Sequence, residues 1–290
     1  MLMLFRLVAL SMCLLVFKSS AIDIVRYNRP HSELDKRDDY PLQLITAALE
    51  ATKEEFGDYE ISFSPLLLKR SRALQALATG KLINVYSAPN NIEWENAISP
   101  IYFPIYRGLL GYRLLLINRS NTQLFADIKS LEELKPLRAG LGLQWSTTKI
   151  LKPQGFTVVT SSSYEGLFGM LHLQRFDYFI RGINEIFYEF EERTDRYPNM
   201  QIEQTKALYI QLPVFFFVSA SEPKLKRRLE AGLWKLHHSG EFDRIFNSYH
   251  SNSIIRSDIK NKRLFVIENN LLAPNPIYQN SELWVDPLSY

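Results

Sequence analysis

The sequence of 290 residues has one cysteine, Cys13, and no uninterrupted apolar run of the length that crosses a membrane. The apolar run from Leu7 to Phe17 has 11 residues, whereas a membrane-spanning helix needs about 20. Arg6 precedes this run, and the small residues Ser19 and Ala21 follow it. This pattern is typical of a secretory signal peptide, so we expect residues 1–21 to be cleaved and the protein to reach the periplasm.

Removal of residues 1–21 would leave a chain without cysteine. Disulfides, cysteine nucleophiles and thiolate metal sites would then be excluded. This removal would take Arg6 and Lys18 from the 34 basic residues. The remaining chain would have 32 basic and 31 acidic residues, which is a net charge of +1. We therefore expect no nucleic-acid partner, because a near-neutral chain does not attract a polyanion.

Motifs for catalysis, metal binding and nucleotide binding are also missing. None of the five histidines has the spacing of a metal motif, and no phosphate-binding loop or GxSxG elbow occurs. The segment from Gly140 begins like a dinucleotide fingerprint, but Trp145 stands where the third glycine is needed. Acidic pairs such as Glu54 and Glu55 lie on predicted helix surfaces. We therefore expect no enzyme, no cofactor and no metal.

Two blocks of alternating strands and helices are present. Strands are predicted at 22–27, 59–63, 82–87, 112–118, 137–143, 157–161, 176–180 and 207–219. Helices are predicted at 40–56, 71–79, 146–152, 163–173, 184–193, 222–238 and 241–250. Crossover helices favour parallel strands within each block. Two such blocks joined by two extended segments predict an α/β protein of two lobes with a ligand cleft between them.

A candidate anion site follows the strand at 137–143. Ser146, Thr147 and Thr148 begin the next helix, where hydroxyl groups and free backbone N–H groups favour a negative group. The alternative is that Ser146 only caps the helix.

Five segments, taken in order, resemble one family. These are LQALATGK at 74–81, ISPIY at 98–102, SLEELKPLRAGLGLQWSTT at 130–148, SYEGLFGMLHLQRFD at 163–177, and residues 229–249. They are similar to the type II periplasmic solute-binding proteins that serve polar amino-acid ABC transporters, over about residues 22–250. The resemblance implies a two-lobed fold in which each lobe is a mostly parallel sheet flanked by helices, with hinge strands near 111–117 and 206–211. It also implies a division of the chain: lobe 1 from 22–117 and 206–251, lobe 2 from 118–205, and an extension at 252–290 packing on lobe 1.

The chain departs from this family at the two charges that recognise a free amino acid. The segment 90–94 has no arginine, and Gly182 stands where the family has an aspartate, with Arg181 beside it. We therefore expect a small anionic or polar ligand without an ammonium group. Arg181 is expected to face the cleft, with an ion pair to Glu185 four residues later as the alternative.

Eight residues are the predicted ligand contacts. They supply arginine guanidinium groups, which suit a carboxylate or phosphate, together with hydroxyl groups and aromatic rings for stacking. They are Tyr27, Arg72, Tyr102, Trp145, Ser146, Thr147, Thr148 and Arg181. The predicted function is a monomeric periplasmic binding protein that delivers its solute to an inner-membrane permease. The alternatives are a sensor or structural partner of a membrane receptor, and a periplasmic lyase or dehydratase with Glu185 as its acid or base.

Overall fold

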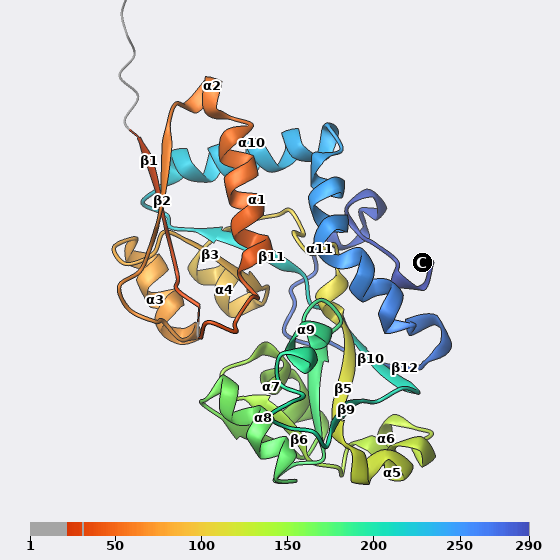
Figure 1. Ribbon diagram of the computed structural model, residues 1–290. Helices are drawn as coiled ribbons and strands as arrows, with labels where there is room; N and C mark the ends of the chain where they lie inside the picture. The colour runs from red at the N-terminus through yellow and green to blue at the C-terminus, as the bar shows by residue number, and fades with distance from the viewer. Residues whose placement is uncertain (1–21, 31, 290) are drawn as a thin grey trace, which may run out of the picture.

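The computed structural model describes residues 22–30 and 32–289, and the expected signal peptide at 1–21 lies outside them. The chain forms two lobes, one above the other in Figure 1. The first lobe contains β1–β4, β11, α1–α4, α10 and α11, and the second contains β5–β10, β12 and α5–α9. The predicted two-lobed α/β fold is confirmed.

The first lobe has two small sheets with helices on more than one side of them (Figure 1). β1 (Asp23–Tyr27) pairs in parallel with β2 (Tyr59–Phe63), and β11 (Val214–Val218) lies antiparallel between β3 (Val85–Pro89) and β4 (Pro100–Ile101). Its helices are α1 (Asp39–Glu50), α2 (Lys53–Phe56), α3 (Arg70–Thr79), α4 (Ile92–Ala97), α10 (Pro223–His238) and α11 (Glu241–Ser257).

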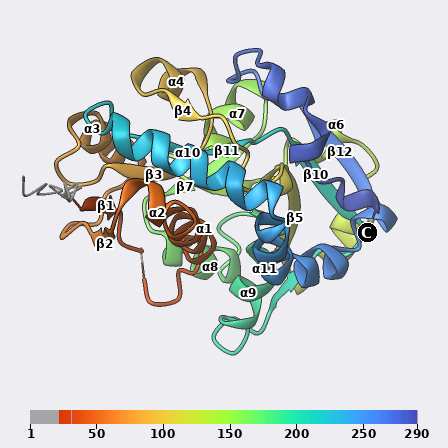
Figure 2. The ribbon, with the colours of Figure 1, turned by 90° about the horizontal axis from the view of Figure 1, so that it is seen from above.

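Helices α1 and α10 lie side by side, as Figure 2 shows. Gly232 on α10 permits this approach, because a Cβ there would collide with the backbone of Ala48 on α1.

The second lobe is built on one mixed sheet with the order β12, β10, β5, β8, β6, β7, and with β9 beside β5. Its strands are β5 (Tyr112–Asn118), β6 (Ala139–Gly142), β7 (Val158–Ser161), β8 (Tyr178–Gly182), β9 (Met200–Ile202), β10 (Lys206–Ile210) and β12 (Arg263–Ile267). Its helices are α5 (Thr122–Asp127), α6 (Leu131–Leu134), α7 (Ser146–Leu151), α8 (Tyr164–His172) and α9 (Ile186–Glu191). β6 is parallel to β7 and β8, so the α7 start follows the carboxyl end of a strand and faces the other lobe.

Three predicted elements differ from the observed ones for physical reasons. The predicted helix at 40–56 is broken at Thr52, whose hydroxyl donates to the carbonyl of Ala48. The stretch 207–219 is two strands, because Pro213 has no N–H to donate to a ladder. β8 ends at Gly182 rather than at Ile180, and this extension places Arg181 inside a buried strand.

The tail after Ser251 crosses between the lobes two further times, in addition to the two hinge connections. α11 continues to Ser257, and β12 then adds to the second-lobe sheet in parallel with β10. The chain returns to the first lobe, where the carbonyl of Leu271 accepts from the N–H of Ile92. The ring of Tyr278 stacks on Phe215 at a centroid distance of 6.5 Å. The tail thus contacts both lobes.

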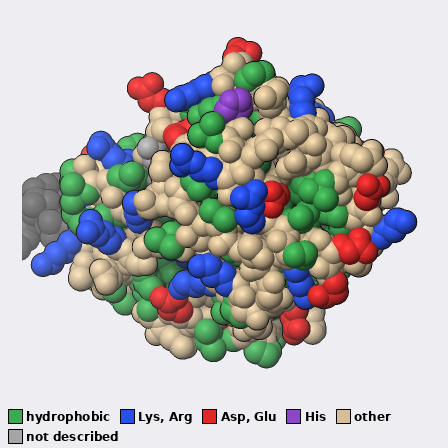
Figure 3. All heavy atoms as spheres, turned by 90° about the horizontal axis from the view of Figure 1, so that it is seen from below, with side chains coloured by type: hydrophobic (Ala, Val, Ile, Leu, Met, Phe, Trp, Pro, Cys, Tyr) green, Lys and Arg blue, Asp and Glu red, His purple; other side chains and the backbone are tan. Residues whose placement is uncertain are grey.

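No helix among residues 22–30 and 32–289 is long and apolar enough to cross a membrane. On the face in Figure 3, acidic side chains lie among the scattered basic ones.

Candidate ligand-binding cleft

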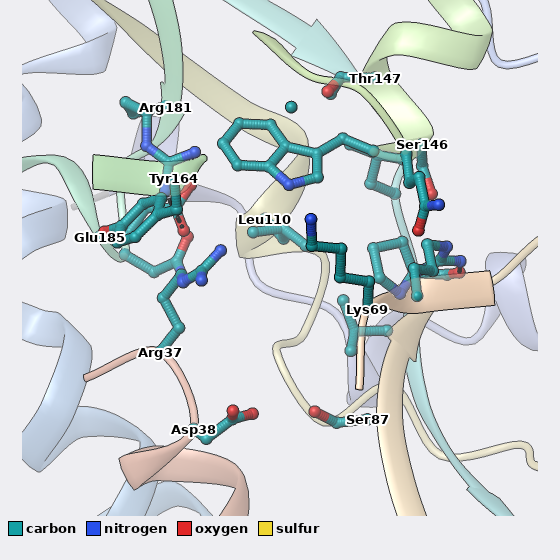
Figure 4. Close-up of a pocket in the computed structure, with 18 of the residues that line it drawn as sticks. Arg37, Asp38, Lys69, Ser87, Leu110, Ser146, Thr147, Tyr164, Arg181 and Glu185 are labelled. Atoms are coloured by element: carbon teal, nitrogen blue, oxygen red, sulfur yellow. Dashed lines mark hydrogen bonds and ion pairs between the residues drawn. The ribbon is translucent and has the colours of Figure 1, made fainter. Parts of the chain in front are cut away.

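A cleft of about 280 Å³ lies between the lobes, close to the lower end of the range of roughly 300–1,000 Å³ typical of small-molecule sites. Its chemically important lining residues are Arg37, Asp38, Lys69, Arg70 and Ser87 from the first lobe and Trp145, Ser146, Thr147, Tyr164, Arg181 and Glu185 from the second. Figure 4 labels all of these except Arg70 and Trp145, and shows the labelled side chains around one space. Among the described residues, no group of His, Cys, Asp and Glu is placed to hold a metal ion.

Arg181 lies in the cleft wall but its charge is already balanced. Its guanidinium is 2.5 Å from the carboxylate of Glu189 and 2.9 Å from that of Glu185. Burial disfavours the charge, yet the two carboxylates outweigh burial and raise the pKa of Arg181. The alternative pairing with Glu185 is therefore present, together with a second acidic partner that the sequence analysis did not identify.

Glu185 is shared with a second buried arginine. Arg113 on β5 is 3.4 Å from Glu185, and burial lowers the pKa of this guanidinium to about 10. Burial alone would raise the pKa of Glu185, but Arg181 and Arg113 lower it. Glu185 is thus held as a carboxylate, which disfavours a role as general acid.

The α7 start offers two hydroxyl groups to the cleft. Thr148 is used internally, since its hydroxyl donates to the carbonyl of Gly142 at 2.7 Å. Ser146 is 6% exposed and its Oγ has no hydrogen-bond partner among the described residues. Thr147 lines the same space. A ligand acceptor or donor would satisfy these groups.

Trp145 forms an aromatic wall at this end. Its indole stacks on Phe179 at 6.0 Å and 16°, and the Arg181 guanidinium lies 4.8 Å from the indole centre. Gly142 permits the close packing, because a Cβ there would collide with the indole.

The first lobe contributes two cations that have no carboxylate partner within the described residues. Lys69 precedes α3, is exposed, and lines the cleft. Arg70 donates to the carbonyl of Pro89 at 2.8 Å and lies 4.6 Å from the ring of Trp94. Burial lowers the pKa of Arg70. Arg72, the predicted contact on the same helix, is exposed and does not line the cleft.

The two predicted tyrosines lie elsewhere. Tyr27 is fully buried in the first lobe, where its hydroxyl bonds Ser87 at 2.7 Å and donates to Asp38 at 3.1 Å. It therefore positions two lining residues and does not itself line the space. Tyr102 is 38% exposed and packs on Phe215, away from the cleft lining.

Asp38 is a lining carboxylate that the sequence analysis missed, because its role depends on burial rather than on a motif. Burial raises the pKa of Asp38 to about 6, the nearby Asp35 adds to the rise, and Arg37 opposes it. Asp35 itself is paired with Arg37 at 2.6 Å. A carboxylate that stays charged at some cost to stability is a common feature of binding sites.

This raised pKa predicts that Asp38→Asn stabilises the protein above pH 6. The folded-state pKa exceeds the unfolded value of about 3.9, so the stabilising contribution of the protonated group is lost as pH rises from about 4 through 6. The variant should gain about 1–3 kcal/mol at pH 8 and little at pH 4. Urea unfolding at both pH values measures this, and an equal difference at the two values would contradict it.

Several contacts join the lobes across the cleft. The side-chain carbonyl of Gln144 accepts from the backbone N–H of Ser71 at 3.3 Å. Lys149 and Glu93 form an exposed ion pair at 2.5 Å. Arg37 lies 4.2 Å from the ring centre of Tyr164. The two lobes are therefore in direct contact around the cleft, and a ligand in it would touch both.

No family profile and no curated protein matches the chain. Solved structures do match. An ancestral arginine-binding protein bound to glutamine is 16% identical, with a TM-score of 0.58 over 79% of this chain and 98% of that one. A periplasmic binding protein of Salmonella typhimurium with high arginine specificity is 14% identical, with a TM-score of 0.57 over 79% and 99%.

A histidine kinase sensor domain similar to periplasmic binding proteins is 17% identical, with a TM-score of 0.56 over 79% of this chain and 95% of that one. In these three cases the match covers 95% or more of the other chain. These matches confirm the fold that the resemblance implied: this chain has the two-lobed fold of the type II periplasmic binding proteins.

Proposed function

We propose that the protein is a non-enzymatic periplasmic binding protein that captures a small polar solute with an anionic group and delivers it to a membrane transporter. The observation that carries this proposal is the set of unpaired polar groups on opposite walls of the cleft. Lys69 comes from the first lobe and Ser146 from the second, and neither side chain has a partner among the described residues.

The ligand chemistry follows from which charges are free. Arg181 and Arg113 are balanced by Glu185 and Glu189, so they contribute little net field. Lys69 and Arg70 are the uncompensated cations, and they suit a carboxylate or phosphate. Asp38 and Ser87, on another side of the space in Figure 4, suit a hydrogen-bond donor of the same ligand.

Closure of the lobes requires that the ligand bind the closed form more tightly than the open one. A solute held by Lys69 and by the α7 hydroxyls satisfies this condition, because those groups come from different lobes. The ion pairs between the lobes, Lys149 with Glu93 and Arg256 with Glu191, are partly exposed, so they would add little on their own.

A thermal-shift screen of the chain from Ile22 onward tests the proposal. The panel holds free amino acids, dicarboxylates, phosphates, sugars and polyamines. A ligand at 100 times its Kd should stabilise by about 2.7 kcal/mol. We expect shifts with anions, and Lys69→Ala should weaken the binding of the best anion by about tenfold to a hundredfold.

Lys81→Ala is the matched control, since Lys81 follows the other end of α3 and is exposed. Equal losses in both lysine variants would show a nonspecific charge effect. Binding confined to sugars or polyamines would reject the anion-binding assignment.

A sensor function is the second candidate, and the tail favours it. Residues 258–289 add a surface over both lobes that a receptor could contact. Absence of any ligand shift, together with binding to a membrane receptor, would favour this function. The lyase alternative is weakened by the ion pairs that keep Glu185 charged.

A further inference from the structure

A second cavity of about 370 Å³ lies between the lobes, beside the ligand cleft. Its first-lobe wall comes from the segment before α1, from α1 and from α11, and its second-lobe wall comes from α8 and α9. We call it the aromatic pocket, after its lining residues Tyr40, Tyr106, Tyr188, Tyr249 and His250.

His250 is the polar group at the inner end of the aromatic pocket. Its side chain is 3% exposed, and neither ring nitrogen has a hydrogen-bond partner among the described residues. Burial lowers its pKa to about 3, so the ring is neutral and has one N–H donor and one nitrogen acceptor. Buried polar groups are usually paired, so two unpaired nitrogens in one lining side chain point to a ligand.

The surrounding tyrosine hydroxyls do not satisfy His250. The Tyr40 hydroxyl donates to the carbonyl of Ile105 at 2.6 Å, and the Tyr106 hydroxyl donates to the carbonyl of Arg37 at 3.1 Å. The rings of both tyrosines lie against the imidazole, with centroid distances of 4.5 and 5.6 Å. The inner end thus offers aromatic surface and one neutral donor–acceptor pair.

Lys36 and Asp39, which also line the pocket, are exposed, whereas the two buried carboxylates of this region have an arginine partner. Glu185 and Glu189 are paired with Arg181, and no acidic group contributes to the pKa shift of His250. An ammonium ligand would therefore find no free carboxylate at the inner end. An uncharged ring with a hydroxyl fits better, because a hydroxyl can accept from and donate to a neutral imidazole.

The aromatic pocket is separated from the ligand cleft by a wall of side chains that line both spaces. Arg37, stacked on Tyr164, forms part of this wall together with Tyr106 and Glu185. The rim is formed by Tyr249, which is 42% exposed, and by the partly buried Tyr188 and Ser253. A molecule can thus enter here without passing through the cleft.

We propose that the aromatic pocket is a second binding site, for a small uncharged aromatic molecule that carries a hydroxyl group. Because its walls come from both lobes, an occupant favours the closed form and strengthens binding in the cleft.

The test uses p-cresol as the probe and tetramethylammonium as the cationic comparison, with the full chain in thermal-shift and calorimetric titrations. We expect p-cresol to raise the Tm of the wild type and of Lys69→Ala alike. His250→Phe keeps the ring but removes both nitrogens, so p-cresol should bind at least about tenfold more weakly. The unliganded variant should have a Tm equal to or higher than that of the wild type, because it buries no unpaired polar atom.

Ser253→Trp fills the rim and provides a test that does not depend on the buried position. Loss of p-cresol binding in His250→Phe or Ser253→Trp, with retention in Lys69→Ala, supports the site. Three results would overturn it: no effect of millimolar p-cresol on the wild type, loss in Lys69→Ala with full binding in His250→Phe, or binding of tetramethylammonium in place of p-cresol. None of these results depends on whether the cleft binds an anion.

Discussion

Replacement of Arg181 by methionine is expected to lower the free energy of unfolding by about 3–5 kcal/mol. Arg181 is 2% exposed, and its guanidinium contacts two carboxylates that are themselves buried. Methionine fills a similar volume but removes the guanidinium paired with Glu189 and leaves Glu185 with Arg113 and Arg37. The loss therefore arises from uncompensated buried charge rather than from a cavity.

The pH dependence identifies this cause. In the wild type the pKa of Glu185 is lowered, so its stabilising contribution exists above the unfolded value and is lost as pH falls. Without Arg181 both carboxylates should take up protons more readily, so the deficit of the variant should be largest at pH 8 and should shrink towards pH 4. Urea unfolding at several pH values measures it. A deficit that does not change with pH would indicate lost packing instead.

Arg244→Ala is the control, because Arg244 forms an exposed pair with Glu241 and its side chain is 67% exposed. We expect a change below about 1 kcal/mol.

Replacement of Arg228 by methionine is expected to have an effect of similar size, about 3–5 kcal/mol, in the first lobe. Arg228 on α10 is fully buried and forms an ion pair with Asp23 on β1 at 2.8 Å. It also donates to the hydroxyl of Thr52 and to backbone carbonyls that end α1 and α2. Its removal takes the guanidinium donor from those carbonyls and leaves the Gly57 carbonyl, Thr52 and Asp23 without their buried cationic partner, although Lys224 of α10 still pairs with Asp23 at 3.1 Å.

Denaturant unfolding of Arg228→Met checks this prediction, with Lys235→Ala on the same helix as its control, since the pair of Lys235 with Glu55 is exposed. Arg228→Lys should restore only part of the stability, because a lysine cannot reach several acceptors at once. A full rescue by lysine would show that the charge alone matters.

Much of the fold could be predicted because apolar periodicity and turn residues act locally. β2 and β5 were predicted with their observed limits, and α3 and α7 within one residue at each end. β12 was not predicted. Its residues, Arg263–Ile267, pair with β10 more than fifty residues earlier, and this long-range pairing leaves little signal in a short exposed edge strand.

The cleft could be predicted only in part. Four predicted contacts do line it, and they could be predicted because the resemblance located the start of α7 and the end of β8. They are Trp145, Ser146, Thr147 and Arg181. The role of Arg181 could not be foreseen in full, since Glu189 reaches it from the first turn of α9, eight residues later in the chain. Asp38 and Lys69 acquire their roles from tertiary burial and from the absence of a partner, and neither property is visible in a local pattern.

The return of the tail from β12 to the first lobe limits how far the lobes can separate at that edge. β12 ends at Ile267 in the second-lobe sheet, and Leu271 is bonded to Ile92 in the first lobe. A chain extends by at most about 3.3–3.6 Å per residue, so this short tether spans roughly 13 Å when taut. Opening beyond that distance would require the Leu271 bond or the β12 ladder to break. The tail thus sets an upper limit on the width of the entrance, and hence on the size of a solute that can enter from this side.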